Sequence, residues 1–515
     1  CIFTEIVTVR SQQCDGGPDS RSLLKRKSTS HGLRGEIFLE NAEMRMNTAI
    51  VEVDRPWLAM SSMLIGAFVG MLSETSLNIA LPTLGRVFSV GTGTLQWLVT
   101  GYMLMIGIVL PFSSLISKWF STRQIIIFAL ADFTVGALIS GFANSFGMLL
   151  FGRMIQGIGT GLILPLMFTV AMLIFPPKKL GLAMGINALV IMFAPAIGPT
   201  VTGIVLGALS WRAVFFMFAI ILIVGLLFAF IGLKNVSRIT RPKIDLPSVL
   251  GSVIGFSSIV AGTSLASEDG WTSPRVLGLL AVGIIVLVLY AGRQLKLDEP
   301  VLNLRVFAKP SFRTGAILVM IDFGIILSAM YLMPQFIQNA MMLPVAMTGL
   351  IMLPGGIVNA LVSAFAGRMY DRMGAKLLAR LGFVIALIGV LMFCLADAKS
   401  SLAYVIAAHV VLMIGCPLAM SPSQTHALNA LAGPESADGS TIMNTLQQIV
   451  GAIATALATS FLAMGQASFP ASSEALRFEH GVRYGFCFTL ALALIGFIVS
   501  LRLKDRKQSE DVDFD

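Results

Sequence analysis

The chain has 515 residues, of which 56% are hydrophobic and only 12% are charged. A soluble globular protein carries about 25% charged residues, so this composition excludes an ordinary soluble domain. The formal net charge of +9 does not indicate a nucleic-acid partner, because the basic residues lie mostly in short loops between apolar segments. The five cysteines show no paired spacing, and we expect neither a disulfide nor a metal site.

Residues 1–45 are polar and unpatterned, and we expect residues 1–56 to form a disordered extension and leader. Fourteen apolar segments follow, each long enough to cross a bilayer. Such segments must be helices, because lipid offers no partner for free backbone groups. We therefore predict an all-α, multi-pass membrane protein. The predicted spans are 57–80, 95–116, 124–143, 147–174, 181–206, 213–233, 246–266, 276–292, 314–338, 346–367, 378–396, 401–421, 440–464 and 484–502.

The distribution of basic residues predicts the orientation. Loops after even-numbered spans hold sixteen Lys and Arg residues, and loops after odd-numbered spans hold six. The positive-inside rule therefore places both termini, including a tail at 503–515, in the cytoplasm.

A cytoplasmic loop pattern recurs weakly in the two halves of the chain. Between the tenth and eleventh spans the sequence reads Gly367-Arg-Met-Tyr-Asp371-Arg372-Met-Gly374, and a weaker copy, 114–123, joins the second and third spans. Glycine permits the tight turn, and Asp371 can cap a helix or pair with a basic residue, which would latch one conformation. An ordinary charged loop is the alternative. Without spans seven and eight, two groups of six helices remain.

Three further motifs of polar or helix-bending residues lie within the spans. Arg153 in the fourth span is costly in lipid and must face protein or water, unless it snorkels at the interface. In the fifth span, Gly198 permits close packing, while Pro199 removes a backbone hydrogen bond and bends the helix. In the first span, Glu74 and Asn78 are four residues apart and share one helical face.

These motifs, in this order over about residues 55–503, resemble those of the fourteen-helix drug:proton antiporters of the major facilitator superfamily. The polar thirteenth span and His409 are similar to the lincomycin-resistance branch. The resemblance implies six-helix bundles at 57–233 and 314–502, with an inserted transmembrane hairpin at 246–292.

The resemblance also implies residue roles. Arg153 would be tied to proton transfer, and Gly198 and Pro199 would belong to the antiporter motif. Lys118 stands where the family usually has Asp, so the first-half loop departs from the pattern. The residues implied to control conformation are Gly198, Pro199, Gly367, Asp371, Arg372 and Gly374.

Few acidic, Arg or His residues lie inside the predicted spans away from the span ends: Glu74, Asp132, Arg153, Asp322 and His409. Placing an Asp or Arg side chain at the middle of the membrane costs about 2.5–3.5 kcal/mol of insertion free energy. A buried carboxylate escapes this cost by binding a proton. Because it can then hold a proton or an organic cation but not both, it provides a simple basis for exchange. We predict Glu74, Arg153 and, on burial cost alone, Asp322 as the proton-coupling residues. For Asp132 we favour packing, and for His409 packing and a relay remain open.

We expect a large apolar substrate cavity. Soft methionine and aromatic side chains suit varied lipophilic ligands, although ordinary helix packing is the alternative for any single residue. The candidate substrate-binding residues are Asn78, Phe323, Tyr331, Gln335, Asn444 and Gln448.

The leading functional hypothesis is a proton-coupled exporter of lipophilic, often cationic drugs. An exporter of an endogenous metabolite, peptide or siderophore is the alternative. The sequence has no phosphate-binding loop and no soluble domain able to bind ATP, which argues against a primary pump. No cytoplasmic cluster suggests an enzyme, and the antiporter motif argues against a channel. We expect no cofactor, a monomer in the bacterial cytoplasmic membrane, and protons, lipid and small lipophilic molecules as partners.

Overall fold

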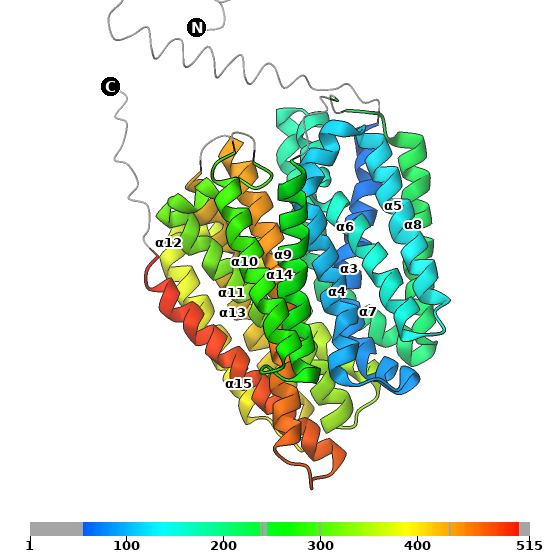
Figure 1. The fold of residues 1–515 in the computed structure, drawn as a ribbon, viewed down its shortest axis with the longest axis vertical. Helices are drawn as coiled ribbons and strands as arrows, with labels where there is room; N and C mark the ends of the chain where they lie inside the picture. Colours follow the sequence, from blue (N-terminus) through cyan, green and yellow to red (C-terminus); the bar gives the residue numbers. More distant parts are fainter. Residues whose placement is uncertain (1–54, 237–238, 240–244, 298–299, 432–433, 504–515) are drawn as a thin grey trace, which may run out of the picture. The chain divides into compact units, whose positions relative to one another are not determined.

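The structure, a computed structural model, describes residues 55–503 except 237–238, 240–244, 298–299 and 432–433. Every regular element within these residues is a helix (Figure 1). The predicted leader and tail lie almost wholly outside the described residues. The elements are α3 (Pro56–Phe88), α4 (Thr92–Trp119), α5 (Thr122–Gly141), α6 (Phe146–Ile174), α7 (Pro177–Ala208), α8 (Trp211–Gly232), α9 (Leu246–Asp269), α10 (Pro274–Gln294), η1 (Leu304–Ala308), α11 (Pro310–Gln335), η2 (Phe336–Ala340), α12 (Val345–Leu395), α13 (Leu402–Asn429), α14 (Pro434–Ala467) and α15 (Glu474–Ser500).

The number of membrane spans agrees with the sequence. Within the described part of the chain, 13 helical segments are long and apolar enough to cross a membrane. A fourteenth is counted when the two arms of α7, Leu189–Pro195 and Ile197–Ala208, are taken as one span bent by 42°. The tenth and eleventh spans both belong to α12, which departs from helical geometry at Gly374. The predicted all-α membrane fold is therefore confirmed.

Local sequence sets where several helices begin. Ser121 accepts a hydrogen bond from the backbone N–H of Gln124, whose side chain accepts one from the backbone N–H of Ser121. This capping box satisfies two of the free donors at the start of α5. Pro56 begins α3 and Pro310 begins α11. Proline is tolerated at the first position of a helix because the backbone N–H there has no partner within the helix.

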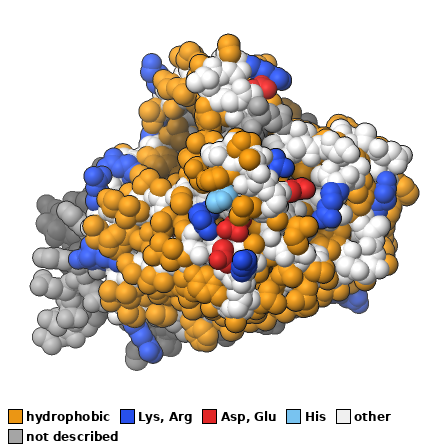
Figure 2. Space-filling view, turned by 90° about the horizontal axis from the view of Figure 1, so that it is seen from below, with side chains coloured by type: hydrophobic (Ala, Val, Ile, Leu, Met, Phe, Trp, Pro, Cys, Tyr) orange, Lys and Arg blue, Asp and Glu red, His pale blue; other side chains and the backbone are white. Residues whose placement is uncertain are grey.

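The outer surface of the helices is apolar. Ile220 and Ile231 on α8 are 65% and 72% exposed, and Leu289 on α10 is 68% exposed. Figure 2 shows one face, on which hydrophobic side chains predominate and the few charged ones lie among them. In water such surface would be unfavourable, whereas in a bilayer it contacts lipid tails.

The helices α9 and α10 pack against each other, and α9 also contacts α4 and α14 (Figure 1). Thr100 on α4 and Ser264 on α9 share a hydrogen bond of 3.4 Å. Asp245, directly before α9, accepts hydrogen bonds from Arg293 Nε and Nη2 over 2.8 and 2.6 Å. The hydrogen bonds from Arg293 lower the pKa of Asp245 to about 2. This ion pair therefore holds α9 and α10, which form the hairpin, together at the end where α9 begins. The exact domain boundaries stay predictions.

The two halves of the chain approach closely where α7 meets α12. Thr200 donates to the backbone carbonyl of Gly349 over 3.0 Å. A Cβ added to Gly203 would lie 3.0 Å from the Cα of Gly349. Small residues on both helices therefore permit this close approach.

Candidate functional site

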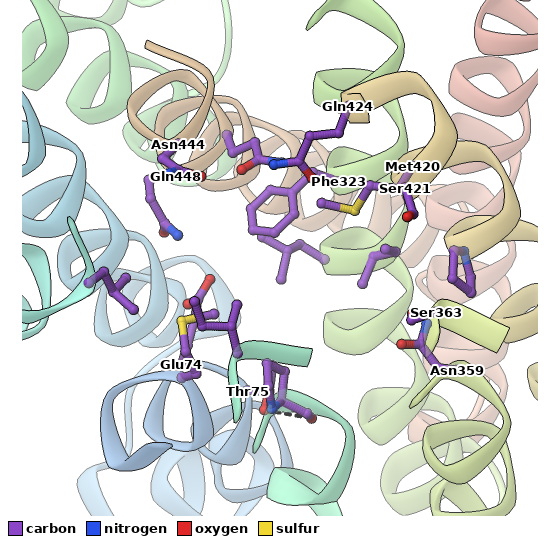
Figure 3. A pocket seen from close by; sticks show the side chains of 18 of the residues that line it. Glu74, Thr75, Phe323, Asn359, Ser363, Met420, Ser421, Gln424, Asn444 and Gln448 are labelled. Carbon is purple, nitrogen blue, oxygen red and sulfur yellow. Dashed lines mark hydrogen bonds between the residues drawn. The ribbon is translucent and has the colours of Figure 1, made fainter. Parts of the chain in front are cut away.

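A cavity of about 310 Å³ lies among α3, α4, α6, α7, α11, α12, α13 and α14 (Figure 3). Its size falls at the lower end of the range for small-molecule pockets. Its wall is mostly aliphatic and methionine-rich, with hydroxyl and amide groups set into it. The lining residues are Met71, Glu74, Thr75, Leu110, Leu164, Phe168, Ile191, Pro195, Phe323, Ile326, Leu327, Met330, Gly356, Asn359, Ser363, Met413, Pro417, Met420, Ser421, Gln424, Ser440, Asn444, Gln447 and Gln448.

Among the described residues that line this cavity, Glu74 is the only Asp, Glu, Lys or Arg. Its side chain is 2% exposed, and its Oε2 has no hydrogen-bonding partner among the described residues. The side chain of Gln448, on α14, hydrogen-bonds to the carboxyl group. Figure 3 shows the two residues on the same side of the cavity. A buried carboxyl with an unused oxygen can accept a proton or a ligand donor.

Arg153, on α6, is fully buried beside this carboxyl and is held by neutral groups. Its Nη1 donates to Ser73 Oγ over 2.6 Å and to Gln156 Oε1 over 2.8 Å. Its Nε donates to the carbonyl of Leu98 over 3.2 Å. The guanidinium carbon lies 4.0 Å from the ring centroid of Tyr102, a distance suited to a cation–π interaction. No ion pair joins Arg153 to a carboxylate among the described residues, so its charge is balanced by dipoles and this ring.

The proline pair of α7 shapes the adjacent wall. Pro199 has no N–H, so the carbonyl of Pro195, four residues earlier, lacks its usual helical donor. Thr75 Oγ1, on α3, supplies that donor over 3.0 Å. A Cβ on Gly198 would lie 2.5 Å from Thr75 Oγ1 and 2.9 Å from the carbonyl of Leu72. Glycine is therefore needed for α7 to reach α3.

Asp322, on α11, lies outside the residues that line the cavity. It is 0% exposed, and neither carboxyl oxygen has an N–H or O–H donor among the described residues. The thiol of Cys416, a weak donor on α13, interacts with it. Both ring nitrogens of His409, on the same helix, lack partners in the described part of the chain. Asp132 accepts a backbone hydrogen bond from Gly159 of α6.

The structure separates the six residues predicted to bind substrate into two groups. Three of them line the cavity, namely Phe323, Asn444 and Gln448. The other three are buried between helices and do not line it, namely Asn78, Tyr331 and Gln335.

The two predicted conformational motifs, the Gly198–Pro199 pair and the loop at 367–374, lie in α7 and α12. Gly374 has φ 73° and ψ 168°, a left-handed backbone conformation that glycine adopts without strain. Gly367 belongs to the helix before this break, and Arg372 is exposed. The side chain of Asp371 lies outside what the structure describes.

The cavity also contains polar residues that the sequence analysis did not select. Asn359 and Ser363 of α12 line it four residues apart, and Ser421 and Gln424 of α13 line it three residues apart. Figure 3 shows Asn359 and Ser363 away from Glu74, on the opposite side of the cavity. The available signal was a pair of polar residues on one face of a span without charges. Among the described residues, no three His, Cys, Asp or Glu side chains gather as a metal site would require.

Comparisons with known proteins agree with this architecture. The family model of the Major Facilitator Superfamily matches residues 63–455. The lincomycin resistance protein LmrB of Listeria innocua is 42% identical over 460 residues, which cover 88% of this chain and 98% of that protein. The protein of the same name from Bacillus subtilis is 43% identical over 455 residues, covering 86% and 95%.

A solved structure supports the fold. The inward-facing, unoccupied bacterial homolog of the human lysosomal transporter Spinster superposes with a TM-score of 0.62. The superposition covers 87% of this chain and 97% of the solved chain. Because the two sequences are only 15% identical, this similarity supports the fold and not the function. The chain is thus a multi-pass membrane transporter and not an enzyme. It belongs to the Major Facilitator Superfamily, in the lincomycin-resistance branch of its drug-efflux transporters.

Proposed function

We propose that the chain exports lipophilic, cationic drugs in exchange for protons. The observation that carries this proposal is the position of Glu74, a buried carboxyl that lines the cavity and has one unpartnered oxygen. Burial disfavours its charged form, so the group gains from binding either a proton or a cationic ligand. Because both would neutralise the same oxygen atoms, binding of one displaces the other.

Arg153 supports this exchange in the proposal. A guanidinium stays protonated inside proteins, so the local charge changes only when Glu74 gains or loses its proton. Because its hydrogen-bonding partners are neutral, the positive charge of Arg153 is available to stabilise the deprotonated carboxylate of Glu74. Asp322 is a second candidate proton site, and it is shielded from the cavity by its neighbours.

The wall of the cavity indicates which ligands it accepts. Met71, Met330 and Met420 provide adaptable apolar surface. Asn359, Gln424 and other amides or hydroxyls can bind a ligand that carries several polar groups. The two curated relatives are named for lincomycin resistance, and we propose lincomycin among the exported compounds. The same polar groups keep an endogenous metabolite, peptide or siderophore as the alternative substrate.

The proposed setting is the bacterial cytoplasmic membrane. The distribution of basic loop residues supports cytoplasmic termini, and the apolar helix surfaces suit direct contact with lipid. In this orientation a proton gradient directed inward would drive export.

The decisive test uses the full chain reconstituted in liposomes with an imposed pH gradient. Transport of lincomycin, a lipophilic cationic dye and a neutral metabolite is measured together with proton movement. We expect Glu74→Gln to abolish gradient-driven transport because glutamine cannot release a proton. Glu74→Asp should retain part of it. Asp132→Asn, which changes an acid outside the cavity, is the matched control and should transport normally.

Two results would contradict the proposal. Full gradient-driven transport by Glu74→Gln would remove this residue from the coupling role. Substrate movement without any proton movement in the unmodified protein would exclude proton exchange altogether.

A further inference from the structure

Two cysteines that are far apart in the sequence lie against each other where α12 ends and α15 passes. Cys394 is the second-last residue of α12, and Cys487 lies in α15. The two thiols lie close enough to interact. The spacing of the cysteines had suggested no disulfide, and the fold places these two thiols within reach of one another.

Contacts on both sides fix the two helices at this level. The rings of Phe393 and Phe486, the residues directly before the two cysteines, stack with centroids 4.6 Å apart and planes 7° apart. Arg483 Nη2 donates to the carbonyl of Ala396 over 3.4 Å. Because the stacked rings directly precede the two cysteines in the chain, this contact brings Cys394 and Cys487 to the same level of the two packed helices.

The pair is accessible from the lipid-facing surface. Cys487 is exposed and Cys394 is half-buried, whereas Cys416 is fully buried. Leu391 and Leu494, on the same two helices, are 46% and 50% exposed. A lipid-soluble reagent can therefore reach the pair from the bilayer. None of these residues lines the transport cavity, so the site is separate from it.

We propose that Cys394 and Cys487 form a redox-active dithiol that a membrane quinone oxidises to a disulfide. The two S–H bonds break and one S–S bond forms. The two electrons and two protons pass to the quinone, which becomes a hydroquinone. The orientation inferred from the basic residues places this end of α12 outside the cytoplasm, where disulfides persist.

The disulfide would join the two ends of a long chain segment. That segment contains α13 and α14, which carry several residues of the cavity wall. Cross-linking a long loop restricts the unfolded chain. Oxidation should therefore raise the unfolding temperature of the transporter.

The test counts thiols in full-length protein in liposomes, after Cys1 and Cys14 are changed to serine. Denatured protein is labelled with a maleimide polymer that adds a visible mass to each free thiol. The reduced protein should take three labels, on Cys394, Cys416 and Cys487. After incubation with a short-chain ubiquinone it should take one, and dithiothreitol should restore all three. Reversal separates a disulfide from irreversible attachment of the quinone.

Matched variants define the pair. Cys487→Ser should take two labels before and after ubiquinone. Cys487→Ser combined with Leu494→Cys places a lipid-exposed thiol further along α15 and should keep all three labels. Three labels on the unmodified pair after oxidation would overturn the proposal. So would label loss that occurs only in covalent dimers on a non-reducing gel.

Discussion

Arg153 Nη1 donates a hydrogen bond of 2.6 Å to the Oγ of Ser73, the residue directly before Glu74 in the sequence. Among the described residues, no ion pair links Arg153 to the carboxyl group of Glu74. The cation and the acid are therefore adjacent without being locked together. A permanent ion pair would hold Glu74 in its charged form. The observed arrangement leaves the carboxyl able to change its proton occupancy while Arg153 stays in place.

Replacing Arg153 tests this arrangement. Arg153→Lys keeps the charge but loses the planar fork that reaches Ser73, Gln156 and the Leu98 carbonyl together. We expect gradient-driven transport to fall on the order of tenfold, as for a coupling energy of about 1–3 kcal/mol. Arg153→Ala should reduce it further. Substrate exchange without a pH gradient is the control, because it should fall less. Equal losses in both assays, with reduced expression, would indicate a structural role instead.

The bond from Thr75 to Pro195 gives a stability prediction. Thr75→Val has nearly the same shape but leaves the Pro195 carbonyl without its donor. An unsatisfied buried group costs about 1–3 kcal/mol, so the unfolding temperature in detergent should drop. Thr75→Ser keeps the hydroxyl and should lie close to the unmodified protein. A valine variant as stable as the serine variant would show that water or another group replaces this bond.

The polar wall opposite Glu74 gives a prediction about substrates. Asn359→Leu removes an amide from the cavity and adds apolar surface. We expect the KM for lincomycin to rise several-fold, while that for an apolar dye changes little. Leu361→Ala is the control, because Leu361 lies on the same helix but is 55% exposed, facing outward. A parallel change for both substrates would argue that Asn359 acts only on packing.

The sequence was informative wherever lipid imposes a strict rule. Apolar length predicted the spans, and the cost of burying charge directed attention to Glu74 and Arg153. It could not separate Phe323, which lines the cavity, from Tyr331, which is buried between helices. Both lie on one apolar helix, and only the packing of the neighbouring helices decides which face meets the cavity. For the same reason Asn359 was missed and Cys394 was not paired with Cys487.

The contact between α7 and α12 gives a further prediction. A Cβ on Gly349 would lie 3.0 Å from the carbonyl oxygen of Pro199 and 3.0 Å from the Cα of Thr200. Both are backbone atoms, so Gly349→Ala requires the two helices to shift apart by a few tenths of an ångström. Overpacking of this kind costs about 1–3 kcal/mol. We expect a lower unfolding temperature and slower transport. Gly278→Ala is the control, since a Cβ there meets nothing within 4 Å.

The ion pair at the base of the hairpin predicts a pH dependence. Hydrogen bonds from Arg293 hold the pKa of Asp245 at about 2, below its ordinary value. A depressed pKa stabilises the fold at any pH above the ordinary value, and this stabilisation is lost as the pH falls through about 2. Asp245→Asn should therefore lower the unfolding temperature equally at about pH 5 and about pH 8. The loss should be small, because Asp245 is partly exposed and salt screens the pair. The measurement is thermal unfolding in detergent at low and high salt. A deficit that grew between about pH 5 and about pH 8 would mean that Asp245 titrates there, and would contradict its pairing with Arg293.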